Sequence, residues 1–220
     1  MNTPVSREGN LIRYSVYLAG YLIVIGINKL VRSNAKVRIW DVILFALMTA
    51  AVLLFYIYRY NRENRFFKKD TELSFLDNFG AVVAMTIVVA IGRIGVSYLQ
   101  AYGKLPSYGF QSLYLKHESV NMFWFLVVAN GVILPVMLEF LTSGFLFNYL
   151  FRGSNPMTGF VGMIASGLIF ACLSFEFQIP LFIVNFIFGA FFAWSYLFTH
   201  SIWTPIYLAA VSGIMMIVMM

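Results

Sequence analysis

Charge and cysteine are both scarce in this chain. Only 11% of its 220 residues are charged, 61% are hydrophobic, and the mean hydropathy is +0.82. A soluble globular domain has about a quarter of its residues charged, so this composition excludes that class and indicates an integral membrane protein. The single cysteine, Cys172, excludes an intrachain disulfide. Because it lies in an apolar stretch, we expect it to be a small hydrophobic residue of the core.

Histidine is equally scarce, since only His117 and His200 are present. Both lie at expected membrane edges, where we expect interfacial or solvated side chains. A zinc site needs three or four converging ligands, and these histidines form no recognisable spacing with Glu139 or Glu176. The sequence therefore predicts no metal site and no cofactor.

The alternating pattern of a membrane β-barrel is also missing, and long uninterrupted apolar runs take its place. These runs predict an all-α, polytopic transmembrane bundle of about seven spans, since a span needs about 20 mostly apolar residues. The expected spans are residues 11–30, 39–58, 79–100, 120–151, 157–175, 179–198 and 202–220. The fourth is about 45 Å long at about 1.5 Å per residue, so we expect Pro135 to kink or break it, with a turn at residues 152–156.

The chain is expected to form one membrane domain in two parts. Residues 1–118 hold the first three spans, of which the N-terminal pair is expected to be peripheral, together with basic loops and a polar loop near residues 101–119. Residues 119–220 hold the core, where small residues such as Gly167 and Gly189 permit close helix packing.

The net charge of +6 is concentrated beside expected membrane ends. Nine of the fifteen Lys and Arg residues lie between Lys29 and Lys69. Anionic lipid headgroups are the natural counter-ions there, so we expect lipid contact in the cell membrane and no nucleic acid as a partner. With the N-terminus inside, inner loops carry eight Lys and Arg residues and outer loops six, which favours a cytoplasmic N-terminus.

Two ionisable residues lie inside apolar runs. An ionisable group at membrane depth costs roughly 2.5 to 3.5 kcal/mol, so Glu139 is expected to face the protein interior or a cavity. Arg93 cannot lose its proton and needs a partner, for which Glu139 is the predicted choice. The alternative is that Arg93 extends to the membrane interface.

Serines recur in the apolar segments, but a nucleophilic serine needs a base, and we expect none within one helical turn of any of them. They are expected to serve helix packing. The serines are Ser143, Ser166, Ser174, Ser195 and Ser212.

Three stretches of the C-terminal half form a recognisable series. The first has Pro135, Leu138-Glu139 and Ser143-Gly144, the second runs from Phe170 to Ser174, and the third joins Trp203-Thr204-Pro205 to Ala209 and Gly213. The series resembles the CPBP or Abi group of bacterial intramembrane proteases, relatives of the CAAX-processing endopeptidases. Their pattern is a proline, Glu-Glu-x-x-x-Arg-Gly, Phe-x-x-x-His, and Trp-x-Pro before His-x-x-x-Asn or Asp.

The chain matches the non-catalytic residues of the family pattern and differs at the residues that carry the family's catalysis. Pro135, Glu139, Gly144, Phe170, Trp203 and Pro205 match the family pattern. Leu138 stands for the first glutamate, Ser143 for the arginine, Ser174 and Ala209 for the two histidines, and Gly213 for the asparagine. In the family the first glutamate and the histidines are taken to activate water. Losing a general base typically costs about 10² to 10⁴ in rate, so we expect no peptidase activity.

The predicted function is that of a pseudoprotease, a membrane scaffold or regulator of another membrane protein. The resemblance implies a cell-wall enzyme or a sensor kinase of a Gram-positive bacterium as the regulated protein. A partner's transmembrane helix would occupy the former substrate cleft. The alternatives are a bacteriocin self-immunity protein, a peptidase with a relocated site built from Glu139, Ser143 or Ser174, and His200, or a transporter. A transporter would need a helix broken at mid-membrane and two similar halves, and the halves differ.

Overall fold

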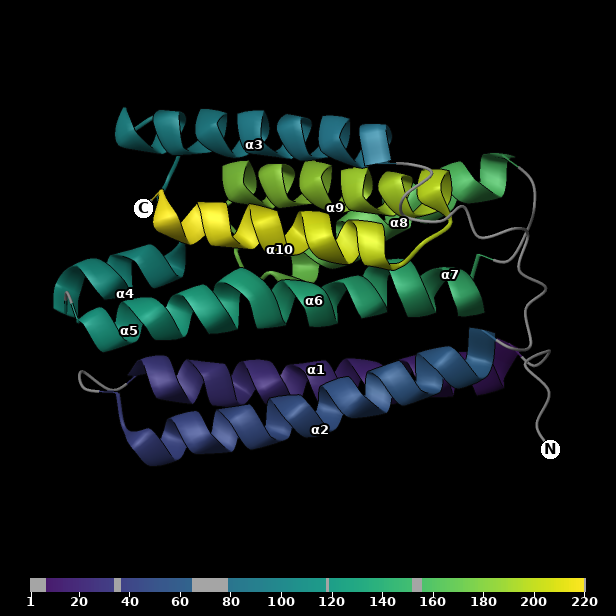
Figure 1. Cartoon of the computed structure of the whole chain (residues 1–220), viewed down its shortest axis with the longest axis horizontal. Helices are drawn as coiled ribbons and strands as arrows, with labels where there is room; N and C mark the ends of the chain where they lie inside the picture. Colours follow the sequence, from purple (N-terminus) through teal and green to yellow (C-terminus); the bar gives the residue numbers. More distant parts are fainter. Residues whose placement is uncertain (1–6, 34–36, 65–78, 118, 152–155, 220) are drawn as a thin grey trace.

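A computed structural model describes residues 7–33, 37–64, 79–117, 119–151 and 156–219. All regular structure in these ranges is helical (Figure 1). The separate helices are α1 (Arg7–Ser33), α2 (Ile39–Asn64), α3 (Phe79–Ala101), α4 (Gly109–His117), α8 (Pro156–Leu173), α9 (Ile179–Thr199) and α10 (Trp203–Val218). One long helix consists of α5 (Val120–Leu126), η1 (Val127–Ile133), α6 (Leu134–Glu139), η2 (Phe140–Phe145) and α7 (Leu146–Tyr149).

The prediction of a polytopic helical bundle is confirmed, and every expected span contains a helix. In the described ranges six helices are long and apolar enough to cross a membrane, and α10 is a shorter apolar helix. Its 16 residues extend roughly 24 Å, somewhat less than the hydrocarbon thickness of a bilayer.

The break expected at Pro135 is wrong, because the helix is continuous from Val120 to Tyr149. The alternative, a kink without a break, stays a prediction. Proline has no N–H for the carbonyl four residues earlier, which belongs to Gly131. The preceding stretch, η1, widens into π-helical turns, and at its end the Leu134 N–H bonds the carbonyl of Ala129, five residues earlier. The wider turn accommodates the proline without ending the helix.

The prediction of a polar loop at residues 101–119 is also wrong in part, because this segment contains the helix α4. The side chain of Gln111 accepts a hydrogen bond from the Tyr108 N–H at 2.8 Å, which holds the start of this helix. Tyr108 and Phe110 are buried, so the segment folds back into the bundle.

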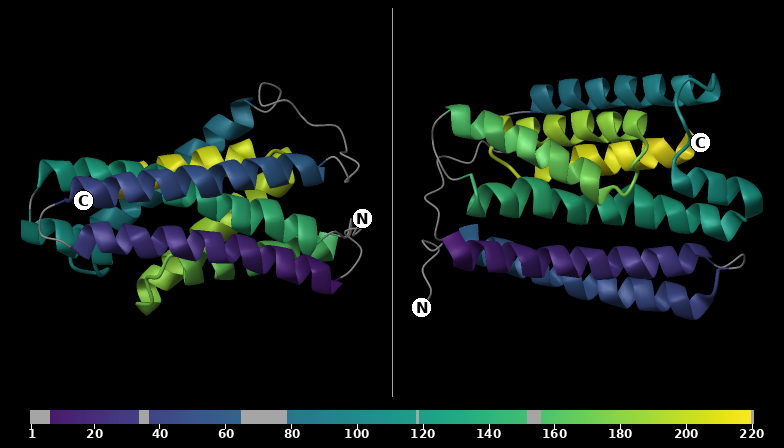
Figure 2. Two further views of the ribbon diagram at one scale, coloured as in Figure 1. Left: turned by 90° about the horizontal axis from the view of Figure 1, so that it is seen from below. Right: turned by 180° about the vertical axis from the view of Figure 1, so that it is seen from behind.

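The helices run roughly along one axis in layers (Figure 1). The α1–α2 hairpin lies on one side of the long helix, and α3, α8, α9 and α10 lie on the other, as the view from behind in Figure 2 also shows. The helix α10 packs against α3, α9 and the long helix. Buried residues from Tyr14 to Ile217 form one hydrophobic cluster, to which both parts of the chain contribute.

Small residues bring α8 and α9 into close contact, as predicted. A methyl group on Gly189 would lie 2.5 Å from Cβ of Phe170, and one on Gly167 would lie 2.8 Å from the carbonyl of Phe186. Only glycine permits this separation of the two helices.

Aromatic contacts attach the α1–α2 hairpin to the long helix. The ring of Tyr17 stacks on Phe145 with centroids 4.1 Å apart, and its hydroxyl lies 3.3 Å from that of Tyr149. Arg59 of α2 donates to the same Tyr17 hydroxyl at 2.9 Å. The hairpin, expected to be peripheral, therefore covers one side of the core.

Cys172 is exposed, so its expected place in the core is wrong. It lies on the face of α8 that points away from the bundle, where a small apolar side chain suits lipid. His200 is exposed at the junction of α9 and α10, as predicted, in a left-handed conformation with φ of 50°. The side chain of His117 and the turn from Arg152 lie outside the described residues.

Candidate functional site

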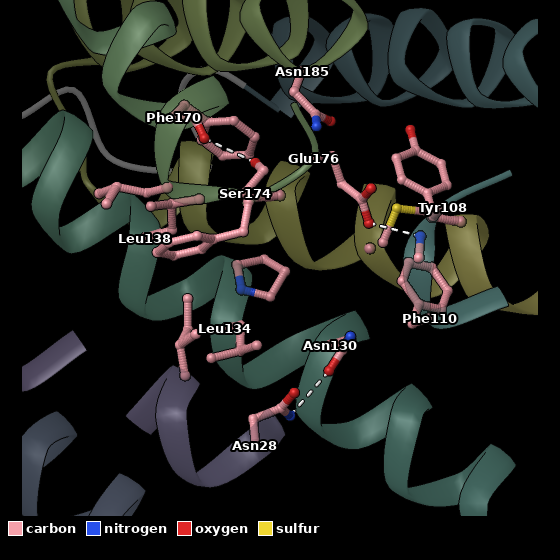
Figure 3. Close-up of a pocket in the computed structure, with 18 of the residues that line it drawn as sticks. Asn28, Tyr108, Phe110, Asn130, Leu134, Leu138, Phe170, Ser174, Glu176 and Asn185 are labelled. Atoms are coloured by element: carbon pink, nitrogen blue, oxygen red, sulfur yellow. Dashed lines mark hydrogen bonds between the residues drawn. The ribbon is translucent and has the colours of Figure 1, made fainter. Parts of the chain in front are cut away.

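Four residues at the motif positions surround one cavity of about 580 Å³, shown in Figure 3. Leu138 reaches it from α6, Ser174 follows the end of α8, and Ala209 and Gly213 come from α10. These positions are up to 75 residues apart in the sequence, from 138 to 213. The fold thus brings together the positions that the resemblance relates to water activation.

None of the four side chains can take a proton from water. Leu138 and Ala209 are apolar and buried. The hydroxyl of Ser174 donates to the carbonyl of Phe170, one turn earlier, at 2.8 Å. A serine with its proton engaged by its own helix is not paired with a base, so it lacks the activation that a nucleophile needs.

Gly213 has no space for a side chain at all. A Cβ atom there would collide with the carbonyl oxygen of Gly131 and lie 3.0 Å from Cγ of Pro135. The helix α10 therefore contacts the long helix at the position where the family has asparagine. An asparagine side chain would require the two backbones to separate.

The retained motif residues mainly serve packing. Pro135 lines the cavity, and the buried ring of Phe170 meets Phe192 edge to face with centroids 5.7 Å apart. A methyl group on Gly144 would lie 3.2 Å from the ring of Tyr60, so this glycine permits the approach of α2. Pro205 is buried at the start of α10, whereas Trp203 is 62% exposed.

Glu139 and Ser143 form a buried pair on the long helix. The hydroxyl of Ser143 donates to Oε2 of Glu139 at 2.6 Å, and both residues are fully buried. The expectation that no base lies within one turn of a serine is therefore wrong here, because positions i and i+4 are neighbours on a helix. Neither residue is among those that line the cavity.

Arg93 is buried, but the prediction that it pairs with Glu139 is wrong. Its Nε donates to Ser212 Oγ at 2.6 Å, its Nη1 donates to the Tyr108 hydroxyl at 3.0 Å, and its guanidinium carbon lies 4.1 Å from the ring centre of Phe188. The predicted ion pair is absent because α3 packs against α10, while Glu139 bonds within its own helix. Extension to the membrane interface is excluded as well, since Arg93 is only 4% exposed.

Sequence reasoning missed three asparagines of the cavity. Asn28 of α1 donates to Asn130 of η1 at 3.0 Å, and Asn185 enters from α9, as Figure 3 shows. Among the described residues, Nδ2 of Asn185 has no hydrogen-bond partner. Their position within apolar spans was the signal that could have revealed them, because a polar residue at membrane depth usually faces a cavity or a partner.

Charged residues lie where the cavity reaches the end of the bundle. Lys29 and Arg32 from the end of α1 and Glu176 from the α8–α9 turn belong to its lining. Glu176 accepts a hydrogen bond from the Gly109 N–H at 2.8 Å. Partial burial raises the pKa of Glu176 above its ordinary value, and the Gly109 hydrogen bond and the positive charge of Arg32 oppose that rise.

Within the described residues, no three His, Cys, Asp or Glu side chains gather closely enough to hold a metal ion. The cavity instead joins apolar walls to amide, hydroxyl and guanidinium groups. Such an arrangement is suited to binding a ligand by shape and hydrogen bonds.

Comparison with known proteins finds one family whose model matches the C-terminal part of the chain. Residues 120–215, somewhat under half of the chain, match the sequence model of the family described as type II CAAX prenyl endopeptidase Rce1-like. The match spans the long helix, α8, α9 and most of α10, and it confirms the predicted resemblance. No curated protein and no solved structure matches the chain significantly.

Proposed function

The segment from residue 120 to residue 215 matches the model of the Rce1-like family, and from this match we propose that the chain is a non-catalytic relative that regulates another membrane protein. One observation carries the proposal. The four positions that the resemblance links to water activation line one cavity, and they present Leu138, Ser174, Ala209 and Gly213. On this proposal, the cavity serves for binding at the place where an active family member would hydrolyse its substrate.

Hydrolysis requires a general base beside the reacting water and donors for the developing oxyanion. Arg93 and Glu176, two charged residues of the cavity, are poorly suited to replace the base. A guanidinium does not give up its proton, so Arg93 cannot act as one. Glu176 lies at the end of the cavity and already accepts a hydrogen bond from a backbone N–H.

The cavity volume refines how a partner would bind. A membrane-spanning helix about 10 Å wide and about 30 Å long occupies roughly 2,400 Å³. The cavity holds about 580 Å³, which is the size of a small-ligand site. We therefore propose that a partner's transmembrane helix packs beside the cavity and inserts individual side chains. A sensor kinase or a cell-wall enzyme of a Gram-positive cell membrane is the proposed kind of partner, with anionic lipids at basic residues such as Lys29 and Arg38.

Site-specific photo-crosslinking in native membranes tests this function. A crosslinker replaces Phe175, which lines the cavity and is 45% exposed. The matched control replaces Phe160 of α8, which is 58% exposed and does not line the cavity. We expect one discrete membrane-protein adduct from position 175 and none of that mass from position 160. Equal adducts from both positions, or none from either, would contradict the proposal.

A peptidase with a relocated site is the second candidate, favoured by the 2.6 Å hydrogen bond between Ser143 and Glu139. Complete burial of both residues opposes it, because a nucleophile must reach its substrate. A fluorophosphonate probe should leave Ser143 unlabelled in lipid. Labelling that disappears in Ser143→Ala would establish the relocated site.

Transport and bacteriocin immunity remain alternatives with less support. The long helix is continuous past Pro135, so the broken helix that favoured transport is absent from residues 120–149. Immunity would be one form of regulation by binding.

A further inference from the structure

The positive charge of Arg93 has no counter-ion among the described residues. Its hydrogen-bond partners are the neutral hydroxyls of Ser212 and Tyr108, and its flat face rests on the Phe188 ring. A buried charge without an opposite charge is strongly destabilising, so Arg93 requires an explanation beyond helix packing.

A second buried polar group lies next to it. Asn185 is 4% exposed, lines the same cavity and leaves its Nδ2 without a partner in the described ranges. It is three residues before Phe188 on α9, so the two side chains are neighbours on one helix face. An unbonded buried N–H is costly and is rare in proteins. The amide donor and the guanidinium therefore belong to one polar corner of the cavity.

The charge along the described lining is positive overall. Lys29, Arg32 and Arg93 contribute three cations, and Glu176 contributes one carboxylate. In addition, Nε of Arg32 is buried and has no hydrogen-bond partner among the described residues. A cavity with this balance concentrates anions.

Apolar side chains form another part of the lining. In the view of Figure 3, Leu134, Leu138 and Phe170 lie to the left, while Tyr108 and Glu176 lie to the right. Ile25, Leu173 and Phe192 add to the apolar lining. The cavity is thus itself amphipathic, and its volume of about 580 Å³ suits a molecule larger than a simple ion.

We propose that this cavity binds an amphiphile with an anionic head, a phosphate or a carboxylate, held by Arg93 and Asn185 with its apolar chain along Leu134 and Leu138. The anion supplies the counter-charge that the buried guanidinium lacks and accepts a hydrogen bond from the unbonded amide. This inference goes beyond the proposed function, because it requires neither a protein partner nor the loss of catalysis. Arg93 and Tyr108 also lie outside the segment that matches the family.

Ligand titration of the full chain in dodecyl maltoside tests the inference. The probe is dodecyl phosphate, and the comparison ligands are inorganic phosphate, which lacks the chain, and dodecyltrimethylammonium, which carries the opposite charge. Thermal unfolding and calorimetric titration are both measured. With dodecyl phosphate at a hundredfold excess over Kd, Tm should rise by roughly 5 to 10 °C, and neither comparison ligand should raise it.

Two variants locate the site. Asn185→Leu removes the unbonded amide, so it should fold at least as stably as the parent yet bind dodecyl phosphate roughly tenfold more weakly. Arg93→Gln should bind more weakly still. The matched control is Thr49→Val, which removes a buried, unbonded hydroxyl of α2 that does not line the cavity, and its affinity should be unchanged.

The outcomes separate the possible ligands. Saturable binding that weakens in Asn185→Leu and persists in Thr49→Val supports the inference, even if Arg93→Gln fails to fold. An equal Tm rise with inorganic phosphate would overturn the assignment of an amphiphile. A rise with the cationic amphiphile, or unchanged binding in Asn185→Leu, would overturn the anion site.

Discussion

Adding one methyl group at Gly213 tests whether α10 packs too closely against the long helix to admit a side chain at the position where the family has asparagine. In Gly213→Ala the new Cβ would meet the carbonyl oxygen of Gly131, with the carbonyl carbon and Cγ of Pro135 each at 3.0 Å. The first two of these atoms are backbone, so the contact can be relieved only by moving α10 away from the long helix.

The expected cost follows from this geometry. Overpacking a well-packed interior costs about 1 to 3 kcal/mol. Replacing glycine by alanine in a helix offsets roughly 0.5 to 1 kcal/mol of that. The net loss is at most about 2.5 kcal/mol, which lowers Tm by at most roughly 10 °C for a chain of this size, and the backbone contact favours the upper part of this range.

Thermal unfolding in detergent measures the effect. The matched control is Gly95→Ala in α3, where a Cβ would meet nothing within 4 Å. That variant should unfold at the same temperature as the parent or higher. If Gly213→Ala matched Gly95→Ala in Tm, the reasoning that this position has no space for an asparagine would be refuted.

Three further predictions concern the buried charges and their partners. Arg93 and Glu139 have separate partners, so the effects of Arg93→Gln and Glu139→Gln on unfolding free energy should add to within about 0.5 kcal/mol in a double-mutant cycle, and a larger coupling would show that they interact. Tyr108→Phe removes the hydroxyl bonded to Arg93 and should cost about 1.5 to 3 kcal/mol in urea unfolding, whereas Tyr102→Phe, at an exposed tyrosine, should cost almost nothing; equal costs would contradict the contact. The raised pKa of Glu176 means that the folded chain holds this proton more strongly than the unfolded chain, so its contribution to stability falls as pH rises from the ordinary carboxylate pKa to the folded one. Glu176→Gln should remove that part of the dependence of Tm on pH, and an identical profile in parent and variant would contradict it.

Much of the fold was predictable because each span is a continuous apolar run of the length that a bilayer requires. The path of the long helix was not, since a proline in sequence does not reveal that the preceding turns widen to accommodate it. Cys172 shows a further limit, because hydropathy does not distinguish a lipid-facing side from a buried one.

The candidate site was predictable in its motif positions and not in its polar contacts. The family resemblance located Leu138, Ser174, Ala209 and Gly213, which the fold gathers around one cavity. The partner of Arg93 depended on which helices adjoin α3, and that is a property of the packed bundle. The prediction of Glu139, chosen because it is a carboxylate within an apolar run, was therefore wrong.

Incorporation of heavy oxygen from labelled water into peptide carboxyl groups tests the central claim most directly. The chain is reconstituted in liposomes with a peptide library, and new carboxyl termini are analysed by mass spectrometry. On the proposal that the chain is non-catalytic, we predict the same incorporation as in protein-free liposomes. Incorporation that appears with the parent chain and disappears in Ser174→Ala or Glu139→Gln would contradict the account.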